Sequence, residues 1–277
     1  MQIYRSQSLI KPPQGRLFIY APKFDKVAVT SSQWLKRMHP AFVPVIFLVS
    51  LLFSGLTVAQ HSQKLLFIGN SFTFFNQGID HHVAALARHV TPSQELFTQR
   101  NAFGGETLKG HVTRRDTVEV IAKHNWDHVI LQGYSNEPIT DYARFEKYAL
   151  RLTNEARDAG ATVHLLMTWA YRKQPAMTEK LQRAYERAAR NTATRAIPAG
   201  AAFALAVQRQ PQLNLYSDNK HPNTAGTYLA ACVVYQWLFD IPSSQSRYYG
   251  GLSPQQARFL QQVASDTVTQ FKPNKMQ

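Results

Sequence analysis

The sequence predicts an α/β fold, a three-layer α/β/α sandwich with about five parallel strands. From residue 64 onward, short apolar runs alternate with segments of helical periodicity. The runs are continuously apolar, as expected for parallel strands whose two faces are both covered. The segments between them are long enough for the crossover helices that parallel strands require. We therefore expect βαβ units that build a single domain over residues 60–277.

The expected strands are short aliphatic runs. The first ends at Gly69, the second is weak and precedes the turn Gly104-Gly105, and the third contains Val129-Ile130-Leu131. The fifth is the shortest. Their ranges are Lys64–Gly69, Leu96–Arg100, Trp126–Leu131, Val163–Thr168 and Ala196–Ala199.

The expected helices follow from apolar residues three and four positions apart and from residues that favour helix ends. Gly160 closes one helix, and Pro222 suits the first position of another, because proline has no N–H to leave unpaired there. The ranges are Ile79–Val90, Thr117–His124, Tyr142–Ala159, Met177–Thr194, Ala201–Gln208, Pro222–Phe239 and Pro254–Phe271.

Residues 1–59 have the pattern of a leader with a secretory signal peptide. Lys36 and Arg37 precede an apolar run from Ala41 to Leu56, and small residues up to Ala59 resemble a cleavage site. The alternative is a membrane anchor, but the run is shorter than the roughly 20 residues that a span needs. We expect cleavage near Ala59, no stable membrane span afterwards, and export to the periplasm or the medium.

A signal peptide rarely follows so long a leader, so Met38 is a second candidate for the true start of translation. Removing residues 1–59 leaves 218 residues, enough for one domain with a sizeable core. The same removal takes +6 of the formal net charge of +14. The remaining basic residues form no clustered stripe, so nucleic acid is not an expected partner. The single cysteine, Cys232, lies in an apolar run and is expected to be a buried structural thiol.

A candidate nucleophile follows the first strand directly. The strand ends at Gly69, and Asn70-Ser71 come next, at the edge of the sheet where open α/β folds place their ligands. A serine here could also merely cap a helix. A serine hydroxyl becomes a useful nucleophile only when a base takes its proton.

Asp218 and His221 supply a base and its partner near the other end of the chain. Their spacing places both side chains on one side of a turn, so Asp218 can accept from one ring nitrogen while the other faces Ser71. The alternative is that Asp218 only caps the helix and His221 is a surface residue. The chain order Ser, Asp, His agrees with α/β-hydrolases, but the G-x-S-x-G elbow of those enzymes is absent.

Three segments together resemble the SGNH or GDSL-type esterases and lipases. Gly69-Asn70-Ser71-Phe72-Thr73 matches the Gly-Asn-Ser variant of their first block, and Asp218 to Pro222 matches their Asp-x-x-His-Pro block. Asn101 to Thr107 resembles the block that supplies a glycine N–H. Ile68–Thr73 and Gly226–Ala231 are most similar to a little-characterised bacterial branch. The resemblance implies a flavodoxin-like SGNH fold and a catalytic triad of Ser71, Asp218 and His221.

The resemblance also implies an oxyanion hole made by the N–H groups of Ser71 and Gly105 and by a side-chain amide. Counted from Asp127, Asn136 falls where the family has its asparagine, although Tyr134 and Glu137 replace the flanking glycine and aspartate. Gln132, at the end of the third strand, is the alternative donor.

Other candidate sites have weaker support. No metal site is expected, because His81 and His82 are adjacent and point apart on a helix. Trp169, Tyr171 and Tyr134 could line a sugar-binding cleft or belong to the core and its rim. A carboxylate pair, Glu137 and Asp141, has nothing to partner it as a glycosidase would require.

The predicted function is a serine esterase that hydrolyses carboxylic esters without metal or organic cofactor. The expected partner is a small-molecule or polysaccharide ester, with O-acetyl groups on carbohydrate as the first hypothesis. An envelope glycan acyltransferase and a non-catalytic carbohydrate-binding module on the same fold remain as alternatives.

Overall fold

A parallel sheet of five strands forms the centre of the domain. The structure, a computed structural model, describes residues 62–91 and 95–272, and the predicted leader over 1–59 lies outside them. The strand order is β2-β1-β3-β4-β5, and all four neighbouring pairs are parallel. The strands are β1 (Gln63–Gly69), β2 (Leu96–Ala102), β3 (His128–Leu131), β4 (Thr162–Leu166) and β5 (Arg195–Ile197).

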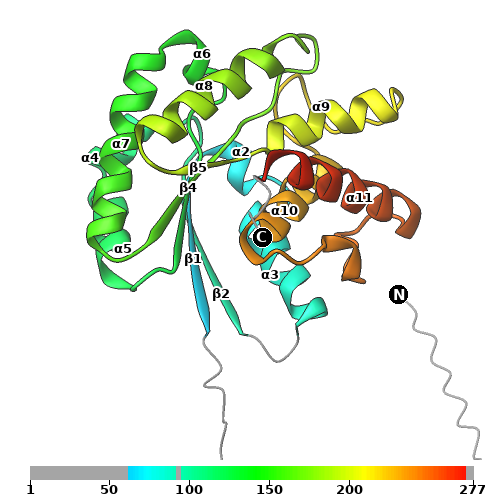
Figure 1. Cartoon of the computed structure of the whole chain (residues 1–277), viewed down its shortest axis with the longest axis horizontal. Helices are drawn as coiled ribbons and strands as arrows, with labels where there is room; N and C mark the ends of the chain where they lie inside the picture. The colour runs from blue at the N-terminus through cyan, green and yellow to red at the C-terminus, as the bar shows by residue number, and fades with distance from the viewer. Residues whose placement is uncertain (1–61, 92–94, 273–277) are drawn as a thin grey trace, which may run out of the picture. The chain divides into compact units, whose positions relative to one another are not determined.

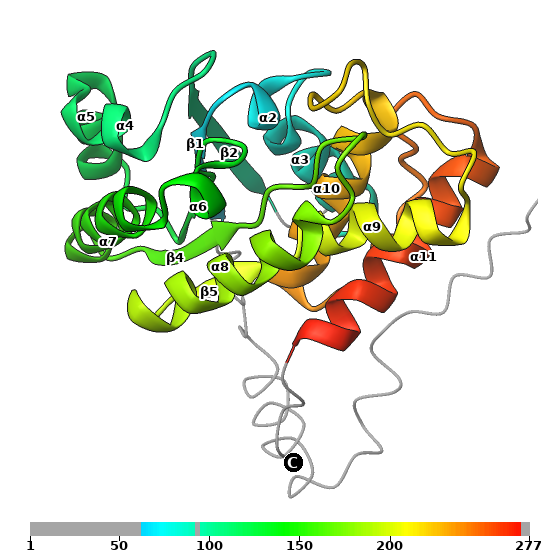
Figure 2. The ribbon, with the colours of Figure 1, turned by 90° about the horizontal axis from the view of Figure 1, so that it is seen from above.

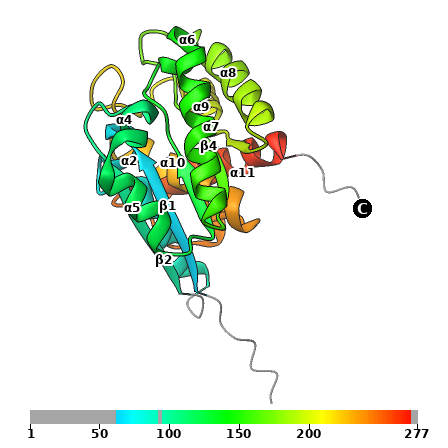
Figure 3. The same cartoon turned by 90° about the vertical axis from the view of Figure 1, so that its left-hand side faces the viewer.

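Helices cover both faces of this sheet, which confirms the predicted α/β/α sandwich (Figure 1). One face packs against α3 (Ile79–Val90), α9 (Ala199–Arg209), α10 (Thr224–Phe239) and α11 (Pro254–Phe271). The other packs against α4 (Leu108–Thr113), α5 (Arg115–Lys123), α7 (Tyr142–Asp158) and α8 (Met177–Asn191). In Figure 3, α5 and α7 cover the face of the sheet that is turned toward the viewer, and β1 is visible between them.

Alternate residues of each strand feed the two cores. In β1, Leu65 and Phe67 pack toward α3 and α10, whereas Leu66 and Ile68 pack toward α4 and α5. This two-residue period requires a strand that is apolar throughout, and all four side chains are almost completely buried. The continuous apolar runs of the sequence are thereby explained.

Helix α10 is buried around nearly its whole circumference. Apolar residues occur on every side of it, from Leu229 to Trp237, because it packs against α3, α9 and α11 at once. Figure 2 shows α10 behind α9 and α11. The sequence gives α10 a high mean hydropathy without a polar face, as expected for an internal helix.

The start of α10 differs from the expectation. The helix begins at Thr224, and the side chain of Asn223 caps it by accepting from the N–H of Gly226 at 3.1 Å. Pro222 lies before the cap, in an antiparallel bridge with Tyr216. Proline was therefore wrongly placed at the first helical position; it belongs to the turn that precedes the helix.

Three short helices were not expected: α2 (Ser71–Phe74), α6 (Glu137–Thr140) and α4. The first two are single turns, too short for a 3.6-residue period to appear in the sequence. A 3₁₀ turn, η2 (Ser243–Gln245), precedes α11. Both α2 and α6 follow strands, at the carboxyl edge of the sheet.

Candidate active site

The first strand delivers Ser71 to the carboxyl edge of the sheet. Asn70 caps α2: its side-chain oxygen accepts from the N–H of Phe72 at 3.2 Å, so Ser71 becomes the first residue of the helix. The side-chain amide of Asn70 donates to the carbonyls of Glu106, at 3.0 Å, and Gly133, at 3.3 Å. One side chain thus joins the loops that follow β1, β2 and β3.

Asp218 and His221 lie in a closed turn between Tyr216 and Pro222. The bridge of those two residues pins its ends, and the N–H of Ser217 donates to the carbonyl of His221 at 3.0 Å. One carboxylate oxygen of Asp218 accepts from the N–H groups of Lys220 and His221, both at 2.7 Å. The carboxylate is held by its own turn and does not cap α10.

Ser71, His221 and Asp218 form a continuous hydrogen-bonded chain. Nδ1 of His221 lies 2.7 Å from Oδ2 of Asp218, and Nε2 lies 3.0 Å from Oγ of Ser71. Because an ionised carboxylate only accepts, Nδ1 carries a proton and donates a hydrogen bond to Oδ2 of Asp218. Nε2 of the neutral ring is then free to accept from the serine hydroxyl, which is the geometry of a general base next to a nucleophile.

The charge on Asp218 is stabilised by its hydrogen bonds. The bond from His221, together with the two backbone N–H donors, lowers the pKa of Asp218 to about 2, although burial opposes this. The carboxylate therefore remains ionised throughout the range in which an imidazole changes its charge. Its side chain is half exposed, whereas that of His221 is one-fifth exposed.

Aromatic rings hold the imidazole on two sides. Phe75 stacks on the ring of His221, with 4.5 Å between centroids and 6° between planes. Phe72 meets the same ring edge-on at 5.8 Å and also stacks on Trp169 at 4.6 Å. The indole N–H of Trp169 donates to the carbonyl of Lys220 at 3.0 Å, which ties the segment after β4 to the turn that carries His221.

Asn76 connects the serine segment directly to the histidine turn. Its amide donates to the carbonyl of Pro222 and to the hydroxyl of Thr227, both at 2.9 Å. The residue adopts φ +52°, in the left-handed region that asparagine tolerates better than most side chains. Sequence reasoning missed this residue, and the only local signal is the turn-forming stretch Asn76-Gln77-Gly78.

A cavity of about 310 Å³ opens beside the serine and histidine. Gly105 contributes to its wall with φ +70°, a conformation that glycine adopts without strain. Both predicted main-chain donors, Ser71 and Gly105, therefore line one cavity. The complete lining is Asn70, Ser71, Phe72, Phe74, Phe75, Gly104, Gly105, Tyr134, Ser135, Lys220 and His221.

Neither predicted amide donor, Asn136 or Gln132, lines this cavity. Asn136 lies at the start of α6, where its carbonyl accepts from Thr140. The oxygen of the buried Gln132 side chain accepts from the N–H of Asn70 at 3.0 Å and the hydroxyl of Thr73 at 2.9 Å. Its amide nitrogen donates to the carbonyl of Gly133. Gln132 thus supports the loop that carries the serine.

The three aromatic residues proposed for a cleft have different positions. Tyr134 lines the cavity, with Nζ of Lys220 5.9 Å from the centre of its ring. Trp169 is fully buried between Phe72 and Phe203, so it belongs to the core. Tyr171 is partly buried and hydrogen-bonds the hydroxyl of Ser135 at 2.8 Å.

The other candidate residues have structural partners. His82 bonds the carbonyl of Asn76 and the hydroxyl of Tyr248. His111 bonds the carbonyl of Gly69, at the end of β1. Over residues 62–91 and 95–272, no group of three or more His, Cys, Asp or Glu side chains is arranged to hold a metal ion. Arg144 pairs with both Glu137 and Asp141.

Cys232 is completely buried in α10. Burial raises the pKa of its thiol to about 12, which suits the structural role expected for it.

Comparison with solved structures defines the fold family. A predicted SGNH hydrolase from Slackia heliotrinireducens has a TM-score of 0.55 to this chain at 25% identity, over 64% of this chain and 98% of the other. A protein of the DUF4886 family from Bacteroides uniformis has a TM-score of 0.63 at 20% identity, over 78% and 98%. The chain has the SGNH hydrolase fold. A catalytic mutant of an acetylxylan esterase from Geobacillus stearothermophilus has a TM-score of 0.53 at 20% identity, over 64% and 95%.

Comparison of the sequence alone identifies no relative: no family model matches the chain, and neither does any curated protein. The solved structures that share this fold include an acetylxylan esterase and a GDSL-like lipase. Within the described part of the chain, no helix has the length and apolar character needed to cross a bilayer.

Proposed function

We propose that the protein is a serine esterase in which Ser71 is the nucleophile, His221 the general base and acid, and Asp218 the residue that orients His221. The observation that carries this proposal is the chain of contacts from Asp218 to His221, 2.7 Å, and from His221 to Ser71, 3.0 Å. If Asp218 only capped a helix and His221 were a surface residue, nothing would require both side chains to align with a serine at the end of a strand.

In the acylation step, Oγ of Ser71 attacks the ester carbonyl carbon while its proton passes to Nε2 of His221. The carbonyl oxygen becomes negatively charged, and we assign its stabilisation to the N–H groups of Ser71 and Gly105, two residues that line the same cavity. When the tetrahedral intermediate collapses, His221 gives the proton to the leaving alcohol. Ser71 is left as an acyl ester.

In the deacylation step, a water molecule attacks the acyl carbon and gives one proton to His221. The second tetrahedral intermediate releases the carboxylic acid, and Ser71 regains its proton. Throughout, Asp218 stabilises the imidazolium that forms after each proton transfer. Its low pKa supports this role, because a carboxylate that stays ionised can keep accepting from Nδ1.

A side-chain donor to the oxyanion would complete the site, and we assign this role to Asn136. Gln132 would have to break its bonds to Asn70, Thr73 and Gly133 before it could donate. Within the described residues, the side chain of Asn136 makes no hydrogen bond, so turning it toward the cavity breaks none.

The proposed substrate is an O-acetyl ester of a carbohydrate. The cavity is small and has aromatic walls at Phe74, Phe75 and Tyr134, which suit a short acyl group with a sugar ring stacked near it. The acetylxylan esterase among the fold relatives gives independent support for this class.

The decisive experiment compares acetyl and long-chain p-nitrophenyl esters, together with acetylated xylo-oligosaccharides, as substrates of the purified protein. We expect turnover of acetyl esters and a loss of at least about 10³-fold in kcat for Ser71→Ala, as for other triads. Ser62→Ala, a change far from the cavity, is the control. Absence of ester turnover in the unchanged protein would contradict the proposal, as would a Ser71→Ala variant that remains active.

We also infer that the mature protein is exported and begins near Gln60. Amino-terminal sequencing of the protein from the cell envelope or medium tests this inference, and mature protein recovered only from the cytoplasm would refute it. The support is the order of a basic segment, an apolar run and small residues within 1–59.

A further inference from the structure

A second cavity, which we call the basic pocket, opens at the end of the sheet opposite to Ser71. It has a volume of about 500 Å³ and lies where β3, β4 and β5 begin. Ser71 follows the carboxyl end of β1, and β3 runs parallel to β1, so the sheet itself separates the two cavities. The residues that define the basic pocket are His128, Arg157, His164, Arg195, Trp237 and Lys272.

Three nitrogen-bearing side chains from neighbouring strands, His128, His164 and Arg195, lie in a row on one face of the sheet at this pocket. His164 is paired in register with Arg195, and Nδ1 of His128 lies 3.2 Å from Nε2 of His164. Two residues further along their strands, Ile130, Leu166 and Ile197 are buried apolar side chains of the same face. The polar row therefore interrupts a face that is otherwise hydrophobic.

His164 is the buried member of this row. Its side chain is only 6% exposed, yet its Nδ1 has no hydrogen-bond partner in the part of the chain that the structure describes. Burial, together with the nearby His128, Arg195 and Lys272, lowers the pKa of His164 to about 3, so the ring is neutral. When His128 donates to Nε2, the proton of His164 resides on Nδ1, and this N–H is an unused donor.

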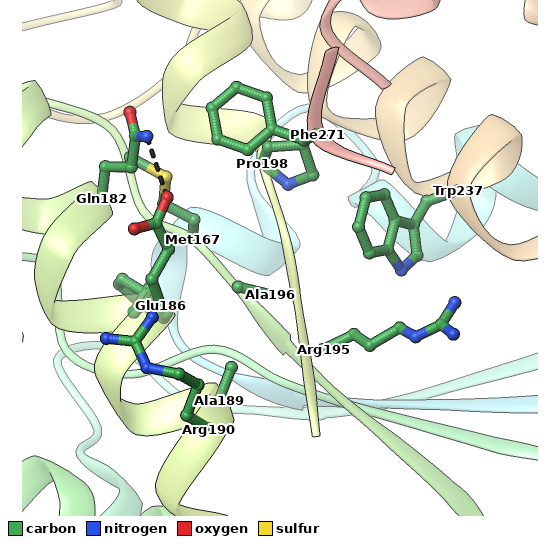
Figure 4. Close-up of a pocket in the computed structure, with 11 residues that line it drawn as sticks. Met167, Gln182, Glu186, Ala189, Arg190, Arg195, Ala196, Pro198, Trp237 and Phe271 are labelled. Atoms are coloured by element: carbon green, nitrogen blue, oxygen red, sulfur yellow. Dashed lines mark hydrogen bonds between the residues drawn. The ribbon is translucent and has the colours of Figure 1, made fainter. Parts of the chain in front are cut away.

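Cations outnumber acids around the pocket. Arg157, Arg195 and Lys272 line it, and Asp240, the one acid among the described residues of its wall, is paired with Lys272. Figure 4 draws a neighbouring cavity that shares Arg195 and Trp237 with the basic pocket, and it shows the side chain of Arg195 extending away from Glu186, which accepts from Gln182 at 2.9 Å.

A second cation lies near the indole of Trp237. Nζ of Lys272, at the end of α11, lies 5.6 Å from the centre of the Trp237 ring, and Arg195 of β5 lines the same pocket. Arginine suits recognition of planar or tetrahedral oxyanions, because its N–H groups form a fork.

We propose that the basic pocket binds an oxyanion group, held by Arg195 and Lys272 and by the Nδ1–H of His164. The shared chemistry is that of phosphate, sulfate or a carboxylate. Such a group could be a free ion or belong to an acidic glycan, and the volume of the pocket admits either source. The site is separate from the proposed esterase centre and does not depend on its assignment.

The test is titration of the full-length protein with inorganic phosphate, followed by calorimetry and by ¹⁵N chemical shifts of histidine side chains. We expect saturable binding with a shift of the His164 Nδ1 signal. Arg195→Gln should weaken binding by about tenfold or more, as expected from the loss of a charge-assisted hydrogen bond. A parallel titration with a short galacturonate oligosaccharide identifies the source: tighter binding than phosphate indicates an acidic glycan, and weaker binding indicates the free ion.

Arg183→Gln is the matched control, because it removes one positive charge from an exposed position on α8. Arg195→Lys keeps the charge and should retain part of the affinity, which separates a binding defect from a folding defect. Turnover of p-nitrophenyl acetate should be the same in all three variants. Equal weakening by Arg183→Gln and Arg195→Gln would overturn the proposal, as would binding that does not saturate or that leaves the His164 signal unchanged.

Discussion

The ring of Phe75 lies flat against the imidazole of His221, with 4.5 Å between their centres and 6° between their planes. An aromatic face attracts a cation, and the proposed mechanism turns this imidazole into a cation in each transition state. Phe75 is thus in a position to act on His221 when charge develops, without touching the substrate's reacting bond.

Replacing Phe75 by leucine should lower kcat more than it changes KM. The loss of an aromatic face from a partly exposed cation is worth about 0.5–1 kcal/mol, which corresponds to a reduction of roughly two- to fivefold in kcat. Steady-state kinetics with p-nitrophenyl acetate measures it. Phe74→Leu is the matched control, because Phe74 lines the same cavity but stacks on Phe75. Equal effects of the two changes on kcat would count against this role.

Asn136→Ala and Gln132→Ala should have different effects: the first should lower kcat, and the second should lower the free energy of unfolding. Loss of an oxyanion donor costs about 2.7–4 kcal/mol of transition-state stabilisation, so Asn136→Ala should lower kcat by about 10²–10³-fold with little change in unfolding. Gln132→Ala leaves the N–H of Asn70 and the hydroxyl of Thr73 without their partner and should reduce the free energy of unfolding by about 1–3 kcal/mol. Kinetics and urea unfolding of both variants provide the comparison. An active Asn136→Ala enzyme would remove Asn136 from the site.

Asn76→Gly should weaken the connection between the serine segment and the histidine turn. Glycine keeps the left-handed backbone but removes the bonds to Pro222 and Thr227, so we expect a loss of about 1–2 kcal/mol in the free energy of unfolding and a lower kcat. Gln77→Gly is the control, since Gln77 also has positive φ, 73°, and its side chain is exposed. If both variants keep full activity and stability, the link has no role in positioning His221.

The buried His164 should make the domain less stable in acid. Its pKa is about 3 in the folded protein and near 6.5 when exposed, so the unfolded chain binds a proton that the folded protein does not. The free energy of unfolding should therefore fall as the pH decreases from about 6.5 toward 3, by up to about 4 kcal/mol. Denaturant unfolding at several pH values tests this.

The His164→Leu variant should show a flatter dependence over the same pH range, whereas His89→Gln, on the exposed side of α3, should follow the unchanged protein. His128, Arg195 and Lys272 surround His164, and their charges oppose its protonation. If the free energy of unfolding of the unchanged protein does not vary between about pH 6.5 and 4, burial does not lower the pKa of His164 as assigned.

The fold, the serine after the first strand and the Asp218–His221 pair could be predicted because their signals are local. Continuous apolar runs indicate covered strands, and the three-residue spacing of Asp218 and His221 suffices for a bond within one turn. The distance between Ser71 and His221 depends on how the end of the first strand and the turn before α10 meet in space. The resemblance to a known family implied that these two residues approach each other, whereas hydrophobic periodicity and residue spacing carry no information on it.

The remaining features of the site arise from contacts between distant segments. The bonds of Asn76 join residues 146 and 151 positions apart, and no local pattern encodes such partners. Gln132 illustrates the same limit: its place at the end of β3 suggested a donor to substrate, whereas its partners are Asn70 and Thr73. The start of α10 was misplaced because proline favours both a first helical turn and the turn before a cap.

Helix α10 is enclosed on nearly all sides and begins three residues after His221. We therefore expect that repacking its interior, even at Cys232 or Val233, shifts the imidazole relative to the hydroxyl and changes thermal tolerance and turnover together. Engineering for robustness is better directed to the solvent-facing positions of α8, where we expect alterations to leave the alignment of Ser71 and His221 unchanged.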